Sequence, residues 1–206
     1  MARYTEGKCR QCRREGKKLF LKGERCYMKC PIDRKGAIIP GQHGQKGQRR
    51  QSNYGIQLRE KQKAKRTYGI LERQFSKYFE KAAKVPKATG EALLQILELR
   101  LDNIIYRLGF APSRAGARQL VNHGLVMVDG KEVNIPSYQL KVDETISLST
   151  KALAMPTTKK ILADKDRKIP EWLRKKAAVG QVVRLPERAD IDTEINENLI
   201  VEYYSR

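Results

Sequence analysis

Four cysteines within residues 9–30 most limit how this chain can fold. Their spacing is C-x2-C-x13-C-x3-C, and no cysteine occurs after them. The segment is too short and polar to fold by burying a core of its own. Tetrahedral zinc takes four thiolates, and close pairs let one turn supply two ligands. The pattern therefore predicts a structural zinc site formed by Cys9, Cys12, Cys26 and Cys30.

Three other uses of the cysteines are alternatives to zinc. Disulfides would need an oxidising compartment, and residues 1–20 lack the apolar run of an export signal. An iron–sulfur cluster also takes four thiolates, but the spacings match neither common ferredoxin pattern. A catalytic C-x2-C pair would leave the second pair unexplained. We expect zinc in a reducing cytosol, with an iron–sulfur cluster as the alternative.

The charge of the chain is high and uneven. The sequence holds 43 Lys and Arg against 23 Asp and Glu, a net charge of +20. Residues 1–66 carry 20 basic and 5 acidic side chains, whereas residues 67–206 carry 23 and 18. Such asymmetry indicates a basic arm that meets a polyanion. No stretch approaches the roughly 20 mostly apolar residues of a membrane span, so a membrane is not an expected partner.

Two stretches of this basic part are candidates for contact with phosphates. Residues 31–51 are rich in Gly, Pro and Gln, which predicts an extended loop; a flexible linker is the alternative. A helix is predicted from Ser52 or Asn53 to about Arg66. Like charges on one helix face repel and destabilise the helix slightly, and a bound polyanion would turn this cost into a gain. The alternative is that the charged face is simply exposed to solvent. The residues concerned are Lys46, Arg49 and Arg50 in the loop and Arg59, Lys63 and Arg66 on the helix face.

Helical periodicity continues through the middle of the chain. It predicts a helix over 71–83, one longer helix from Thr89 to Leu108, and a helix over 114–123 capped by Ser113. The apolar residues of the last helix are expected to point into the core, and its polar residues toward solvent. The inward set is Ala117, Leu120 and Val121, and the outward set is Arg114, Arg118 and Asn122.

Strand patterns appear only after this helical part. Asp129-Gly130 between alternating valines predicts a type I′ hairpin, and strands are expected over 145–149 and 180–185. Residues 151–168 give no clear pattern. The C-terminal LIVEYY fits a strand or a helix, and Asn196 as a cap favours the helix.

Several of these stretches resemble one known family. Residues 113–138, SRAGARQLVNHGLVMVDGKEVNIPSY, closely resemble the RNA-binding module named after the fourth protein of the small ribosomal subunit. Matches to the bacterial ribosomal protein family itself extend over 40–50, 58–75, 100–111 and the C-terminal YYSR. The resemblance is weakest over about 150–180.

The resemblance implies an α+β fold in three parts. These are an N-terminal zinc-bound basic arm (1–50), a helical domain (51–95) completed by the C-terminal segment (188–206), and an inserted RNA-binding module (96–187) with helices packed on a small antiparallel sheet. Carried over residue by residue, the family's RNA contacts fall on Arg49, Arg50, Arg59, Lys61, Lys63, Arg66, Arg114, Arg118 and Lys131.

The resemblance also implies a role in the cytoplasmic ribosome. The protein would bind small-subunit ribosomal RNA early in assembly, at a multi-helix junction, and help nucleate the subunit body. It would contact small-subunit protein five, which influences decoding accuracy, and line the path by which messenger RNA enters.

Enzymes that carry similar modules add a large catalytic domain, and no nucleophile–base spacing accompanies His43 or His123. We therefore expect no enzyme. A zinc-finger regulator, which would prefer duplex DNA, and a free-standing RNA chaperone are the rival interpretations; DNA is not an expected partner.

Overall fold

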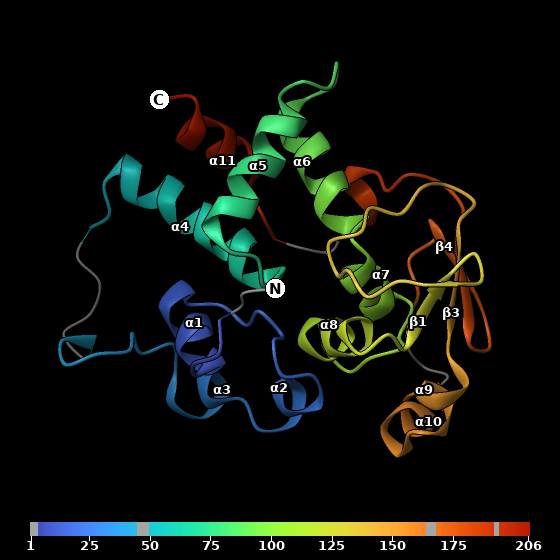
Figure 1. Ribbon diagram of the computed structural model, residues 1–206. Coiled ribbons are helices and arrows are strands. Elements are labelled where there is room, and N and C mark those ends of the chain that lie inside the picture. The colour runs from blue at the N-terminus through green and yellow to red at the C-terminus, as the bar shows by residue number, and fades with distance from the viewer. Residues whose placement is uncertain (1–3, 45–49, 164–167, 192–193) are drawn as a thin grey trace. The chain divides into compact units, whose positions relative to one another are not determined.

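The computed structural model describes residues 4–44, 50–163, 168–191 and 194–206 (Figure 1). The chain forms two compact units. The first unit contains Met1–Leu93 and Thr193–Arg206, and the second unit contains Leu94–Asp192. The three-part division given above remains a prediction.

The first unit begins with three short helices: α1 (Lys8–Glu15), α2 (Glu24–Met28) and α3 (Pro31–Lys35). Gly16 ends α1 in a left-handed conformation, with φ of 71°, which glycine adopts at little cost. Between residues 4 and 44 the buried apolar side chains that the structure describes are Leu19, Cys12, Cys26 and Cys30. Little apolar surface is therefore available to fold this stretch.

Further helices complete the body of this unit. α4 (Asn53–Thr67) begins after Ser52, whose hydroxyl accepts a hydrogen bond from the Gly55 N–H at 3.2 Å. α5 (Glu72–Ala82) buries Phe75, Tyr78 and Ala82.

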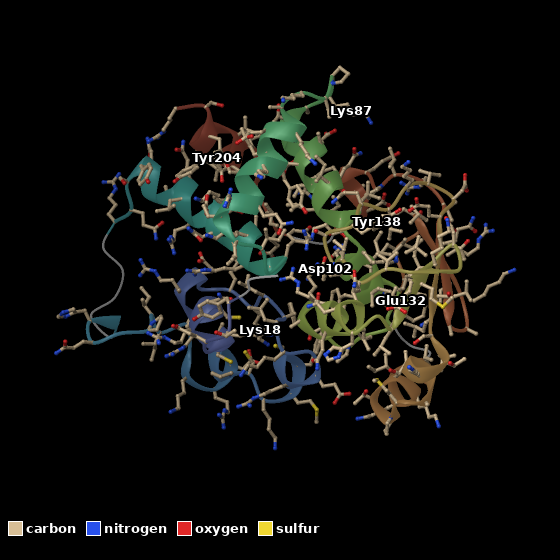
Figure 2. The ribbon with its side chains drawn as sticks, viewed as in Figure 1. Lys18, Lys87, Asp102, Glu132, Tyr138 and Tyr204 are labelled. Carbon is tan, nitrogen blue, oxygen red and sulfur yellow. The ribbon has the colours of Figure 1, made fainter. Side chains whose placement is uncertain are left out.

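The C-terminal helix α11 (Glu197–Tyr204) begins after Asn196, whose side chain accepts from the Asn198 N–H. The C-terminal segment is therefore a helix, as predicted, and not a strand. α11 packs beside α4 (Figure 1) and carries Tyr204, which is labelled in Figure 2. The ring of Tyr204 stacks on Phe79 of α5 with centroids 4.5 Å apart.

The prediction of one helix over 89–108 is wrong. The structure has two helices, α6 (Thr89–Glu98) and α7 (Leu101–Arg107), separated by Leu99 and Arg100. Arg100 has extended backbone angles, with φ of −68° and ψ of 137°. The apolar periodicity runs through this break without interruption, so the pattern alone does not reveal it.

Hydrogen bonds to a distant loop replace those that a continuous helix would make. The N–H of Leu101 donates to the Tyr138 carbonyl at 2.9 Å, and the N–H of Asp102 donates to the Pro136 carbonyl at 3.2 Å. Since each backbone donor must find one acceptor, this pairing ends α6 and sets the direction in which α7 starts.

The second unit packs α7 against α8 (Arg114–Asn122). The hydroxyl of Ser113 accepts from the Gly116 N–H at 3.2 Å, which confirms the predicted cap. Ala117 and Val121 are fully buried as expected. Gly124, with φ of 66°, follows the end of the helix.

A five-stranded antiparallel sheet accompanies these helices, with the order β2-β1-β3-β5-β4. Asp129 and Gly130 have φ of 48° and 77°, as the predicted type I′ hairpin requires. The strands are β1 (Val126–Val128), β2 (Lys131–Glu132), β3 (Thr145–Leu148), β4 (Leu173–Lys176) and β5 (Val179–Val182).

The core of the second unit lies between the sheet and α7 and α8. Trp172, Ile104, Ile105 and Val126 are fully buried in it. Gly180 of β5 leaves room for Leu108, because an added Cβ would lie 2.3 Å from a Leu108 methyl group. The combination of helices and a small antiparallel sheet confirms the α+β class.

Some elements of the second unit were not predicted. They are α9 (Thr150–Ala154), α10 (Pro156–Ala163), β4 and the 3-10 turn Arg188–Asp190. β4 reads LRKK, a poor strand pattern, and is fixed by its pairing with β5. Among the described residues, no helix combines the length and apolarity needed to cross a membrane.

Candidate nucleic-acid interface

The four cysteines come together around one hollow in the first unit. Cys9 and Cys12 lie on α1, Cys26 lies on α2, and Cys30 directly precedes α3. All four line the hollow together with Leu21, Pro31 and Ile32, and all four are free thiols. The first pair thus lies on one helix, whereas Cys26 and Cys30 come from α2 and from the residue before α3.

The surroundings of the Cys12 thiol shift its pKa. Burial is the main cause that raises the pKa of Cys12; a backbone hydrogen bond from Leu19 opposes it, and the other three cysteines add to it. The Lys22 N–H donates to Cys26 Sγ at 3.3 Å. Donor type and proximity therefore fit a thiolate-bound metal. The described residues, which include all four cysteines, nevertheless contain no group of three metal-binding side chains placed to hold an ion.

The basic face of α4 is partly neutralised from within the chain. Arg59 and Arg66 both donate to one carboxylate oxygen of Glu15, which lies at the end of α1. The Glu15 side chain is only 2% exposed, whereas the two arginine side chains are 23% and 22% exposed. Burial raises the pKa of Glu15, while the charges of Arg66 and Arg59 act in the opposite direction. This carboxylate offsets the repulsion that the like charges on α4 would otherwise have.

Lys61 was expected to contact a phosphate, but its side chain is buried against other helices. Its side chain is 4% exposed, and its ammonium donates to Glu72 at 2.6 Å and lies 4.4 Å from the centre of the Tyr203 ring. Lys61 therefore joins α4 to α5 and α11 in this structure. Glu72 also accepts hydrogen bonds from Lys65 and from the Tyr204 hydroxyl.

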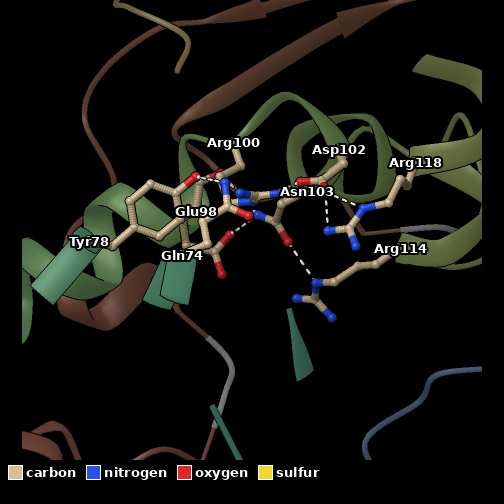
Figure 3. Close-up of polar contacts among 8 residues, drawn as sticks. All are labelled: Gln74, Tyr78, Glu98, Arg100, Asp102, Asn103, Arg114 and Arg118. Atoms are coloured by element: carbon tan, nitrogen blue, oxygen red, sulfur yellow. Dashed lines mark hydrogen bonds and ion pairs between the residues drawn. The ribbon is translucent and has the colours of Figure 1, made fainter. Parts of the chain in front are cut away.

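The two arginines of α8 have different surroundings (Figure 3). Arg118 is buried, and its guanidinium donates to Asp102 at 2.9 and 2.6 Å, so its predicted outward position is wrong. Arg114 is half-buried; its Nε donates to Asn103 Oδ1 at 2.7 Å, and its guanidinium lies 4.6 Å from the centre of the Tyr106 ring.

The remaining candidates are more accessible or lie elsewhere. Lys131, in the hairpin, and Arg50 are exposed. Lys63 is half-buried and forms an ion pair with Glu60. Lys46 and Arg49 lie outside the described residues.

A buried polar network around α7 was not expected from the sequence. Asp102 accepts from Arg100 at 3.0 and 2.7 Å as well as from Arg118. Asn103 donates to the Glu98 carboxylate at 2.6 Å, and Arg107 donates to the same carboxylate. The sequence signal that could have predicted this network is the set of polar residues interspersed in an apolar helical pattern, which includes Glu98, Arg100 and Asp102.

Comparison with known proteins places the chain in a family. Residues 3–98 match the family model described as the ribosomal protein S4/S9 N-terminal domain, and residues 99–146 match the S4 domain. Relatives named small ribosomal subunit protein uS4 are 54% identical in Dictyoglomus turgidum, 55% in Desulforamulus reducens and 56% in Ruminiclostridium cellulolyticum. Each alignment covers the whole of both chains. The chain therefore belongs to the uS4 family of small ribosomal subunit proteins.

Proposed function

We propose that this chain is a structural constituent of the cytoplasmic small ribosomal subunit that binds ribosomal RNA directly. The observation that carries the proposal is the similarity of 54–56% identity over the full length of relatives named for that subunit. The family is one of ribosomal structural proteins, not of enzymes. The net charge of +20 suits a protein whose partner is a polyanion.

Its physical task is to hold RNA segments together against the repulsion of their phosphates. Arginine and lysine side chains neutralise phosphates and release counterions, so affinity depends steeply on salt. Recognition depends chiefly on the shape of the RNA, because the deep major groove of an RNA helix is closed to side chains. The contacts we propose are Lys46, Arg49, Arg50, Arg59, Lys63, Arg66, Arg114 and Lys131.

Lys61 and Arg118 have a different role in this proposal. Both are buried and engaged with carboxylates, Glu72 and Asp102 respectively. They stabilise the helices that carry the accessible cations, and they contact RNA only after those ion pairs break.

We propose further that Cys9, Cys12, Cys26 and Cys30 hold a zinc ion. Four free thiols that line one hollow support this, as does the backbone N–H donated to Cys26. With four protein ligands the ion would be structural, and it would leave no open position for catalysis. Its contribution would be to fix α1, α2 and α3 together, and thereby the start of the basic arm.

Wider roles follow from the family resemblance alone. We propose that the protein nucleates assembly of the subunit body and that it contacts small-subunit protein five, through which it affects translational accuracy. We also propose that it lines the path by which messenger RNA enters the subunit.

The direct test is binding to purified small-subunit RNA at several salt concentrations, followed by footprinting. We expect log K to fall with log salt by about 0.7 to 0.9 for each phosphate that is neutralised. Protection should cluster at one multi-helix junction. A nearly flat salt dependence, or protection scattered evenly along the RNA, would contradict the proposal.

A further inference from the structure

Neighbouring residues of α7 hold two arginines of α8 in chemically different ways. Asp102 is 2% exposed and meets Arg118 with a carboxylate that it shares with Arg100. Asn103 is 1% exposed and meets Arg114 with a neutral amide oxygen (Figure 3). Because the two arginines are four positions apart, they lie on the same side of α8.

The orientation of the Asn103 amide is itself fixed. Its Nδ2 donates to the Glu98 carboxylate at 2.6 Å and to the Glu98 backbone carbonyl at 2.9 Å. Arg107 holds that carboxylate with hydrogen bonds of 3.0 and 2.7 Å. Both acceptors on this side require the NH2 group of the amide, so the oxygen must face Arg114.

The amide oxygen and the aromatic ring together fix the direction of the Arg114 guanidinium. Nε is held by Asn103, and the plane lies over Tyr106. Both of these groups are neutral, and together they restrict how the guanidinium can turn. An arginine that is oriented in advance loses less side-chain freedom when it binds a phosphate, and the planar group makes two hydrogen bonds only in the correct orientation.

We propose that Asn103 is a positioning residue for RNA binding. It cannot touch RNA from its buried position, and it acts by holding Arg114, supported by Tyr106, in the orientation that meets a phosphate. The proposal rests on the RNA-binding function proposed above and adds to it a residue that determines how one contact is made.

A double-mutant cycle tests this directly. The affinity for small-subunit RNA is measured for the full-length protein, Asn103→Ala, Arg114→Ala and the double variant. We expect Asn103→Ala to weaken binding about 5-fold when Arg114 is present and by less than about 2-fold when it is absent. The salt slope should fall by about 0.7 to 0.9 in Arg114→Ala, since one phosphate contact is lost.

Loss of stability has to be separated from loss of positioning. Ile146→Val, which trims the core of the same unit, serves as the matched control and should leave the affinity unchanged. Tyr106→Leu, placed in the same cycle with Arg114→Ala, removes the second support and should also lose its effect when Arg114 is absent. It gives an answer even where Asn103→Ala does not fold.

The possible outcomes distinguish the two proposals. If Asn103→Ala and Tyr106→Leu weaken binding equally with and without Arg114, the positioning role is overturned while RNA binding stands. If the unaltered protein shows no salt-dependent affinity for the RNA, the proposed function itself fails.

Discussion

Glu15 partly neutralises the positive charge of the α4 face. Its carboxylate accepts from Arg59 and Arg66 and is almost fully enclosed. An enclosed carboxylate is costly unless it is paired, and burial accordingly raises its pKa against the effect of the two arginines. The stripe on α4 is therefore a partly neutralised contact between helices as well as a candidate surface for phosphates.

We expect Glu15→Ala to destabilise the first unit by about 2 kcal/mol, because two arginines lose their carboxylate partner. The measurement is the urea midpoint by far-ultraviolet circular dichroism. Glu15→Gln, which keeps an oxygen acceptor, should lose less. The fluorescence of Trp172, which lies in the second unit, is the internal control. Equal stability of Glu15→Ala and the unaltered protein would show that the pairing contributes nothing.

Glu72 makes the stability of the first unit depend on pH. Burial alone would raise its pKa, but hydrogen bonds from Lys61, Lys65 and Tyr204 lower it to about 2 from an ordinary value of 4.5. Because the pKa is depressed in the folded state, the stabilisation is complete above about pH 5 and is lost as the pH falls toward 2.

The unfolding midpoint should therefore fall more steeply with acid in the unaltered protein than in Glu72→Gln, over that same interval. The Glu72 side chain is 46% exposed, so added salt should reduce the difference. Glu91→Gln, at an exposed position of α6, is the matched control. Parallel pH profiles for the unaltered protein and Glu72→Gln would refute this account.

At the scale of elements, the break between α6 and α7 sets the geometry of the buried network. It places Arg100 where its guanidinium meets Asp102, and it places Asp102 where it also meets Arg118. One carboxylate thus serves two buried arginines, and the same turn is held by backbone bonds to the loop at Pro136 and Tyr138.

Removal of this carboxylate should be among the most damaging single changes in the second unit. We expect Asp102→Ala to cost about 3–5 kcal/mol, since it leaves buried guanidinium groups without their counter-charge. Asp102→Asn should cost less because an acceptor remains. Urea unfolding followed by the fluorescence of Trp172, the single tryptophan, reports on this unit. A loss below about 1 kcal/mol would mean that the network is not a structural support.

At the scale of the whole molecule, the two units draw on different sources of folding free energy. The second unit has a continuous apolar core between helices and sheet. The cysteine-containing start of the first unit buries Leu19 and three thiols among its described residues. A structural zinc ion supplies on the order of 10–16 kcal/mol in small modules, which is enough to replace a core.

Metal removal should therefore affect the molecule unevenly. We expect the purified chain to carry one zinc ion, measured by elemental analysis, and a chelator to increase amide hydrogen exchange over residues 9–30. Trp172 fluorescence should not change, and Cys26→Ser should behave like the chelated protein. A visible absorption band would point instead to an iron–sulfur cluster. A metal-free chain with unchanged exchange after chelation would end the zinc proposal.

The sequence by itself determined the features whose cause lies within a few residues. The caps at Ser113 and Asn196 and the hairpin turn at Asp129-Gly130 appear where the pattern put them, because side chain and backbone donor are neighbours along the chain. The cap of α4 is Ser52, one of the two residues that the pattern offered. The family was likewise readable, since it depends on motifs and not on geometry.

Only the tertiary structure decided which cations remain accessible. Arg118 lies on the side of α8 that its local pattern assigned to solvent, yet its partner Asp102 is 16 residues away. The partner of Arg66 is 51 residues away, and the break in the long helix depends on carbonyls beyond residue 135. Helical periodicity records the apolar face of one element, whereas the burial of a charge depends on which distant side chain the fold brings to it.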